Sequence, residues 1–111
     1  VVDWPMAIKP FYTMPKKGNP KLAQAFDLMY EEIELASGGT RVHQEELLVK
    51  QLKEKGLNPQ NFESHIQNFR TGLPPHSGWG LGLDRLTMAL TGVENIRECV
   101  LFPRDRKRLT P

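Results

Sequence analysis

Acidic, hydroxyl and arginine side chains gather in one short stretch, EIELASGGTRVH, which begins at Glu32. In an extended chain, Glu32 and Glu34 point to the same face because side chains alternate along a strand. Two carboxylates with the hydroxyl of Ser37 offer oxygen ligands to Mg²⁺, which binds a few protein oxygens together with substrate phosphates. The guanidinium of Arg41 can clamp a carboxylate with two hydrogen bonds. The alternative is a solvated strand face ending in a Ser-Gly-Gly turn, with Arg41 at the surface.

A second stretch, GWGLGLDRL, places glycine at alternate positions, Gly78, Gly80 and Gly82. Glycines at this spacing leave one face of a strand bare, so a flat ring, a phosphate chain or a neighbouring backbone must come close. Arg85 follows at the start of an expected helix, where it could meet phosphate oxygens. The spacing differs from the GxGxxG dinucleotide fingerprint. The alternative is that the glycines admit a neighbouring helix and that Arg85 pairs with Asp84 or Glu98.

The histidines are weaker candidates. His76, in PPHSG just ahead of the glycine stretch, could face a ligand, and the alternative is a structural or exposed loop residue. His43 could begin a helix or reach Arg41, and His65 lies between polar positions of an expected helix, which favours the surface. No pair of histidine or cysteine residues has the spacing of zinc ligands.

Hydrophobic periodicity indicates which elements position these residues. QAFDLMYEEIEL alternates apolar and polar residues, which predicts one long strand or two adjoining strands. Further on, a helical stripe predicts a helix that ends at Gly56: Leu47, Leu48 and Leu52. Asn58 and Pro59 look like an N-cap and the first residue of another helix, which carries an apolar stripe of its own: Phe62, Ile66 and Phe69.

The remaining segments are less regular. Residues 1–12 predict short strands around a turn, and residues 13–21, rich in proline and lysine, predict a loop. DRLTMALTG predicts a short helix packed through three apolar residues, Leu86, Ala89 and Leu90. A further helical turn is expected at residues 95–99, and VLFP predicts a last short strand. Strand pairs alternating with helices indicate an α+β fold with a mostly antiparallel sheet flanked by helices.

Composition allows one ordinary domain of 111 residues, with 39% hydrophobic and 25% charged residues. The net charge of +2 is too small to indicate nucleic-acid binding by itself, although basic residues crowd into FPRDRKRLTP. Cys99 is the only cysteine, which excludes an internal disulfide and suits a reducing cytoplasm. No apolar run approaches the length of a bilayer span, so we expect no membrane partner. The opening VVDWP reads as the middle of a strand, so we expect a piece of a longer protein or a chain completed by a partner.

Taken in order, IKPFYTMP, FDLMY, ELASGGTRVH, PPHSGWGLGLDRL and NIRECVLFPRDRKRLTP resemble one family. They are similar to the C-terminal part of the catalytic domain of class II aminoacyl-tRNA synthetases, above all the aspartyl-tRNA synthetases of archaeal and eukaryotic type. The resemblance covers essentially residues 1–111, and residues 78–86 look like motif 3 of that class.

The resemblance implies roles for particular residues. Arg85 would hold the γ-phosphate of a bent ATP, and the glycines, Gly80 and Gly82 among them, would let the adenosine lie against the sheet. Glu34 and Ser37 would bind Mg²⁺ at the triphosphate. Arg41 would grip the side-chain carboxylate of aspartate, and we place His76 beside it in the aspartate-binding set.

The implied reaction is formation of aspartyl-adenylate from ATP and L-aspartate, followed by transfer to the acceptor end of tRNA in a cytoplasmic homodimer. Motifs 1 and 2 and the anticodon-binding domain are absent from these residues, so we expect the chain alone to be inactive. Two alternatives stay open: a truncated synthetase-like paralogue that binds nucleotide, amino acid or protein, and a fragment of a related ATP-dependent asparagine synthetase.

Overall fold

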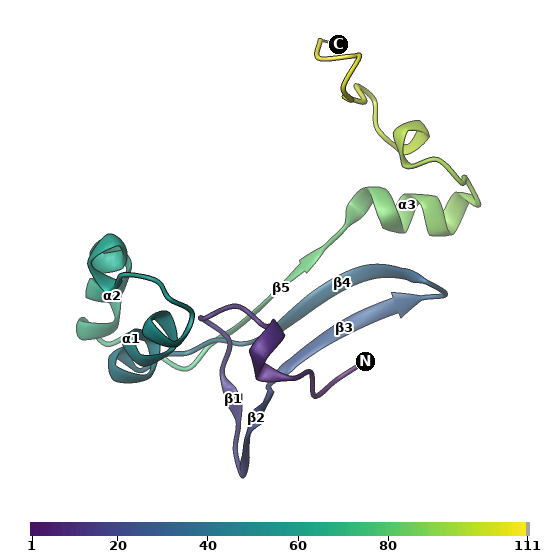
Figure 1. Cartoon of the computed structure of the whole chain (residues 1–111). Coiled ribbons are helices and arrows are strands. Elements are labelled where there is room, and N and C mark those ends of the chain that lie inside the picture. The colour runs from purple at the N-terminus through teal and green to yellow at the C-terminus, as the bar shows by residue number, and fades with distance from the viewer. Residues whose placement is uncertain (111) are drawn as a thin grey trace. The chain divides into compact units, whose positions relative to one another are not determined.

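The computed structural model describes residues 1–110. It contains a three-stranded sheet with the order β3-β4-β5 (Figure 1). The strands are β3 (Ala25–Tyr30), β4 (Ile33–Thr40) and β5 (Ser77–Leu81). The backbone N–H of Gly82 donates to Leu35 (2.8 Å), and that of Arg41 donates to His76 (2.9 Å). Along β4 the residue numbers rise from 35 to 41, while the numbers of their hydrogen-bond partners fall from 82 to 76. The strands β4 and β5 are therefore antiparallel. The two-residue connection between β3 and β4 makes that pair antiparallel as well.

The chain divides into two compact units, and each strand of this sheet contributes residues to both. The first unit comprises Val1–Phe26 and Gly38–Trp79, and the second comprises Asp27–Ser37 and the chain from Gly80 onward. This division assigns Arg41 and His76 to the first unit and Glu34 and Arg85 to the second.

The first unit contains a hairpin, β1 (Pro15–Lys16) and β2 (Asn19–Ala23), and two helices, α1 (Glu45–Glu54) and α2 (Glu63–Arg70). Short 3-10 helices cover Met6–Ile8 and Pro59–Phe62. The core forms where the apolar stripes of α1 and α2 meet, and its fully buried side chains are Val42, Leu48, Leu52 and Ile66. Leu48, Leu52 and Ile66 belong to the two predicted stripes, and the remaining stripe residues are partly buried against this cluster: Leu47, Phe62 and Phe69. The periodicity therefore identified the helical part of the core correctly.

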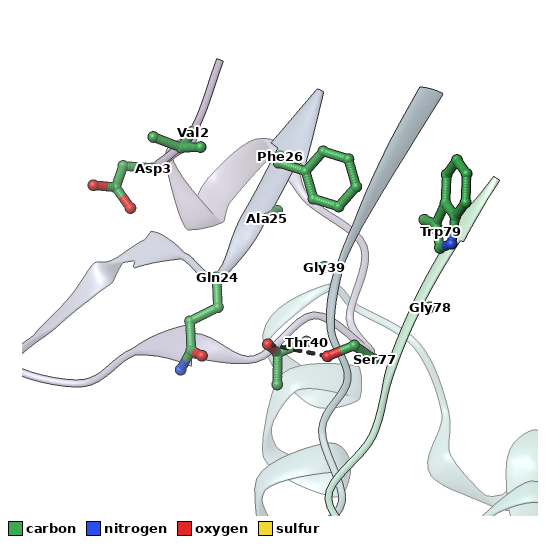
Figure 2. A pocket seen from close by; sticks show the side chains of 10 residues that line it. All are labelled: Val2, Asp3, Gln24, Ala25, Phe26, Gly39, Thr40, Ser77, Gly78 and Trp79. Carbon is green, nitrogen blue, oxygen red and sulfur yellow. Dashed lines mark hydrogen bonds between the residues drawn. The ribbon is translucent and has the colours of Figure 1, made fainter. Parts of the chain in front are cut away.

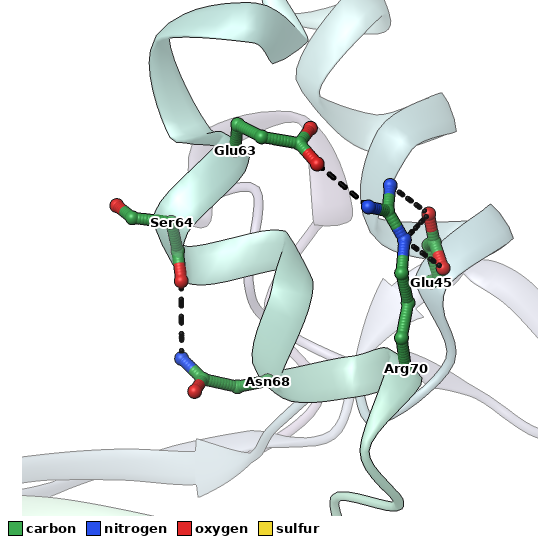
Figure 3. Close-up of polar contacts among 5 residues, drawn as sticks. All are labelled: Glu45, Glu63, Ser64, Asn68 and Arg70. Atoms are coloured by element: carbon green, nitrogen blue, oxygen red, sulfur yellow. Dashed lines mark hydrogen bonds and ion pairs between the residues drawn. The ribbon is translucent and has the colours of Figure 1, made fainter.

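An ionic cluster ties α2 to α1 at the surface (Figure 3). Arg70 donates through Nη2 to Glu45 (2.7 Å) and through Nη1 to Glu63 (2.6 Å). The hydrogen bonds from Arg70 hold the pKa of the Glu45 carboxyl below its ordinary value. In the same helix the side-chain amide of Asn68 donates to the Ser64 carbonyl (3.4 Å). The cluster is a surface supplement to the apolar contacts that join α1 and α2.

The second unit contains α3 (Leu83–Thr91) and the 3-10 helix Ile96–Cys99, whose N-cap Asn95 accepts a hydrogen bond from the Arg97 amide. Its buried hydrophobic residues within the described chain are Leu35 and Ala36, both on β4. Large apolar side chains such as Leu101 stay exposed (84%). No helix within residues 1–110 is long and apolar enough to cross a membrane.

Several local predictions are wrong. Residues 13–21 contribute to the β1–β2 hairpin, because Gly18 adopts φ 85° and turns the chain tightly. Residues 1–12 make isolated bridges and a 3-10 helix where short strands were expected, and VLFP is not a strand.

Other predictions need a smaller correction. The alternating stretch forms two adjoining strands, which is one of the two forms predicted, but Glu32 lies in the turn between them and does not share a β4 face with Glu34. Gly56 (φ 71°) follows the end of α1 as predicted. Asn58 caps a 3-10 turn that precedes α2. Leu86 and Ala89 are partly buried in α3, whereas Leu90 is 78% exposed.

Candidate functional site

Arg41, at the end of β4, carries the most informative side chain of the first unit. Its guanidinium carbon lies 4.5 Å from the centroid of the Tyr12 ring, which is cation–π geometry. A Cβ added to Gly78 would lie 3.4 Å from the Nε and Nη2 atoms of Arg41, so glycine leaves that flank free. Within residues 1–110 no carboxylate forms an ion pair with Arg41. A partly exposed, unpaired guanidinium is suited to bind an anion from outside the chain.

Arg41 and His76 line the same open pocket of about 340 Å³, together with Tyr12 and His65. The His76 carbonyl accepts the Arg41 amide (2.9 Å), and its ring Nδ1 lies 2.9 Å from the Pro74 carbonyl. The Nδ1 contact leaves Nε2 as the ring nitrogen that can meet a ligand. The structure thus brings together both residues that the sequence assigned to aspartate.

His65 is a lining residue that sequence reasoning assigned only to the surface. It is exposed as predicted, and it packs edge-on against Phe69 with ring centroids 5.3 Å apart. Its spacing of four residues from Phe69 on a helix was the signal that could have placed them side by side. His43 is not among the residues that line this pocket.

In the second unit Arg85 projects back from α3 onto β4. Its Nη1 donates to the Glu34 carbonyl (2.7 Å) and lies 3.7 Å from the Glu34 carboxylate. Among described residues its partner is therefore Glu34, and neither Asp84 nor Glu98 takes that place. Both side chains are about half exposed, at 48% and 42%. A surface pair of this kind is weak, so its cation is readily shared with a ligand.

The glycines differ in what surrounds them. A Cβ on Gly80 would meet nothing within 4 Å, and one on Gly82 would lie 3.2 Å from Cδ of Arg85. At Gly38, in contrast, a Cβ would come within 2.5 Å of the Trp79 Cβ and 2.7 Å of the Gly78 carbonyl. The predicted bare face is thus open at Gly80. The glycines that close backbone approach requires are Gly38 and Gly39, whose Cβ atoms would each come within 2.5 Å of a neighbouring atom. Both lie in β4, where sequence reasoning left a Ser-Gly-Gly turn as the alternative.

Glu34 and Ser37 present a carboxylate and a hydroxyl from β4. No group of three or more His, Cys, Asp and Glu side chains within residues 1–110 could hold a metal ion by itself. Mg²⁺ commonly binds through one or two carboxylates and completes its coordination with substrate phosphates and water. By donor type, one carboxylate and one hydroxyl match the few protein oxygens that Mg²⁺ takes when substrate phosphates complete its coordination.

A separate pocket of about 380 Å³ in the first unit has apolar side chains in its wall, namely Val2, Phe26 and Trp79 (Figure 2). Polar side chains at its base include Thr40 and Ser77, whose hydroxyls lie 3.5 Å apart. Neither Arg41 nor His76 lines it. None of the charged residues predicted to bind aspartate or ATP lines this pocket, so we do not assign a substrate to it.

Comparison of the chain with known proteins shows the family to which it belongs. The profile of the tRNA synthetases class II (D, K and N) matches residues 1–106. The chain belongs to this family. A relative from Methanocaldococcus jannaschii, named Aspartate--tRNA(Asp/Asn) ligase, is 60% identical over all 111 residues, which span 25% of its length. The chain thus spans about a quarter of the curated relatives that it matches.

Solved structures of class II synthetases share the fold. An aspartyl tRNA synthetase from Entamoeba histolytica matches with a TM-score of 0.93 and 44% identity over 99% of this chain and 23% of its own. Asparaginyl-tRNA synthetase from Pyrococcus horikoshii, complexed with asparaginyl-adenylate, matches with a TM-score of 0.93 and 34% identity over 100% of this chain and 26% of its own. The α+β fold, with antiparallel sheets and flanking helices, is thereby confirmed.

Proposed function

We propose that this chain is the C-terminal catalytic part of an aspartate–tRNA ligase, which activates L-aspartate with ATP and transfers it to tRNA. The observation that carries the proposal is the 60% identity over the whole chain to a protein named Aspartate--tRNA(Asp/Asn) ligase. In the proposal, residues 78–86 are motif 3, and motifs 1 and 2 and the anticodon-binding domain belong to other parts of the protein. The complete enzyme is a cytoplasmic homodimer that meets the acceptor end of tRNA.

The amino-acid half of the proposed site is in the first unit. Arg41 receives the side-chain carboxylate of aspartate, and the ring of His76 borders the same pocket. A guanidinium matches a carboxylate with two parallel N–H donors, whereas an amide offers only one acceptor oxygen. The unpaired state of Arg41 therefore supports a preference for aspartate over asparagine.

The nucleotide half of the proposed site is in the second unit. Arg85 meets the γ-phosphate of ATP, and the open strand face at Gly80 leaves room for the adenosine, while Gly82 precedes α3 and its missing side chain leaves room for Arg85. Glu34 and Ser37 hold Mg²⁺ at the triphosphate, and when bound the ion neutralises phosphate charge. The aspartate α-carboxylate then attacks the α-phosphorus, the bond to the bridging oxygen breaks, and pyrophosphate leaves.

Two alternatives are separated from the ligase by experiment. A synthetase-like binding module would retain Arg41 and the open glycine face without catalysing adenylation. A related ATP-dependent asparagine synthetase would also activate aspartate but would pass it to ammonia or another nitrogen donor. The binding module and the asparagine synthetase would both use Arg41 to bind aspartate. Only the ligase would transfer aspartate to tRNA, so the formation of aspartyl-tRNA distinguishes it from both.

The test uses the full-length protein that contains this chain. We expect exchange of pyrophosphate into ATP with aspartate, little exchange with asparagine or lysine, and formation of aspartyl-tRNA when tRNA is added. Equal exchange with asparagine or lysine would contradict the role of Arg41. Exchange with aspartate but no aspartyl-tRNA would favour the asparagine synthetase, and no exchange at all would favour the binding module.

A further inference from the structure

The aromatic ring beside Arg41 has no role in the reaction as described so far. We propose that Tyr12 is a positioning residue that holds the Arg41 guanidinium in its receiving orientation and thereby sets the affinity for the aspartate side chain. The inference rests on the proposed function, in which Arg41 binds that carboxylate.

The contact itself is the first argument. An arginine side chain has several rotatable bonds, and fixing them on binding costs conformational entropy. Here the Tyr12 ring lies 4.5 Å from the guanidinium carbon, with no carboxylate of residues 1–110 paired to Arg41. On another flank, Gly78 offers no side chain that could hold the guanidinium. Among described residues the Tyr12 ring is thus the one aromatic partner of this cation.

The backbone that carries Tyr12 is hydrogen-bonded to the segment that directly follows β4 and carries Arg41. The Val42 amide donates to the Tyr12 carbonyl (2.9 Å), and Thr13 forms an antiparallel bridge with Arg41. From α1, the buried side chain of Gln51 donates to the Thr13 carbonyl (3.1 Å) and also to the Phe11 carbonyl. Both neighbours of Tyr12 are therefore anchored through one buried amide.

This arrangement explains a buried polar residue in the helical core. Gln51 is 5% exposed and lies among leucines on α1. If packing were the only requirement at this position, an apolar residue would be sufficient. A buried amide is tolerated when its hydrogen bonds are made, and here they fix the strand segment that places the Tyr12 ring. A receptor group that is preorganised loses less freedom when the ligand binds.

The first experiment measures KM for aspartate and for ATP by pyrophosphate exchange in the full-length protein. We expect Tyr12→Phe to behave like the wild type, because the ring is kept. Tyr12→Leu should raise KM for aspartate by about 2- to 30-fold, the range of a cation–π contact, and leave KM for ATP unchanged. Tyr30→Leu, which removes an exposed tyrosine from β3, is the matched control and should change neither constant.

Because Tyr12→Leu could impair folding, a second series keeps the shape of the ring. Phenylalanine analogues with increasing fluorination at position 12 weaken the negative ring face, so KM for aspartate should rise stepwise with fluorine number. Equal KM values across that series, or a Tyr12→Phe variant as poor as Tyr12→Leu, would overturn the inference.

Arg41→Ala separates failure of the inference from failure of the proposed function. If Arg41→Ala raises KM for aspartate while the fluorinated series does not, only the role of Tyr12 fails. If Arg41→Ala leaves KM for aspartate unchanged, the assignment of the carboxylate to Arg41 fails as well. In the Arg41→Ala background, Tyr12→Leu should have no further effect on KM, since the ring acts through Arg41.

Discussion

At the scale of single residues, Glu34 contacts Arg85 in the structure, and the proposed function gives its carboxylate a second role as a ligand of Mg²⁺. Its backbone carbonyl accepts from Arg85, and its carboxylate lies 3.7 Å from the same guanidinium. In the proposed enzyme, Mg²⁺ and the γ-phosphate would take over the carboxylate and the guanidinium, respectively. The hydrogen bond to the backbone would keep Arg85 close to Glu34 in both states.

This leads to a prediction about Glu34. In the full-length enzyme, Glu34→Gln should raise the Mg²⁺ concentration for half-maximal pyrophosphate exchange by about tenfold or more, because an amide is a weaker ligand than a carboxylate. A titration of exchange rate against free Mg²⁺ checks this. Glu32→Gln, in the turn before β4, is the control and should titrate like the wild type. Matching titrations for Glu34→Gln and the wild type would remove Glu34 from the proposed metal site.

At the scale of elements, two glycines of the sheet have opposite surroundings and make a matched pair. Gly38→Ala should destabilise the protein by about 1–3 kcal/mol or more, because its Cβ would meet Trp79 and the Gly78 carbonyl of β5. Gly80→Ala should leave the thermal midpoint nearly unchanged and raise KM for ATP, because its open face is where we place the adenosine. Thermal unfolding and exchange kinetics of both variants check this. Equal destabilisation would show that Gly80 serves strand packing.

The helix pair of the first unit allows a prediction about pH. Hydrogen bonds from Arg70 lower the pKa of Glu45 below its ordinary 4.5 in the folded state. A lowered folded pKa adds stability above the unfolded pKa, and this stability is lost as the pH falls through the folded value. Glu45→Gln should therefore lower the thermal midpoint slightly at pH 7 and less at pH 3. Glu46→Gln, an exposed neighbour, is the control. A midpoint difference for Glu45→Gln that does not shrink in acid would contradict the ion-pair account.

The sequence predicted helices better than hairpins, for a physical reason. The stripes that include Leu48 and Ile66 are local periodic patterns, and these side chains form the core as expected. The β1–β2 hairpin has little apolar content, and its residues are held by backbone hydrogen bonds and by Gly18. Composition alone therefore favoured a loop. The partial exposure of α3, including Leu90, also could not be read from its periodicity, because a stripe predicts a contact face and not what covers it.

At the scale of the whole molecule, the candidate residues fall into two groups, one in each compact unit. The carboxylate-binding candidates Arg41 and His76 belong to one compact unit, and the phosphate-binding candidates, Glu34 and Arg85 among them, belong to the other. The sequence identified these residues, but it missed the Tyr12 contact to Arg41, because the two residues are distant in the chain and meet only through strand pairing. The chain spans 25% of its relative from Methanocaldococcus jannaschii, so activity is expected of the full-length protein.

The most direct measurement compares Arg41→Ala and Arg85→Ala in the full-length protein by pyrophosphate exchange. We determine KM for aspartate at saturating ATP and KM for ATP at saturating aspartate, with thermal midpoints to verify folding. Arg41→Ala should raise KM for aspartate by about tenfold or more and spare KM for ATP, because losing a charged partner leaves the carboxylate unpaired. Arg85→Ala should raise KM for ATP, or abolish exchange altogether. Where exchange remains measurable, KM for aspartate should stay unchanged. If both variants raise the same constant, or if either behaves like the wild type, the division into a carboxylate half and a phosphate half is wrong.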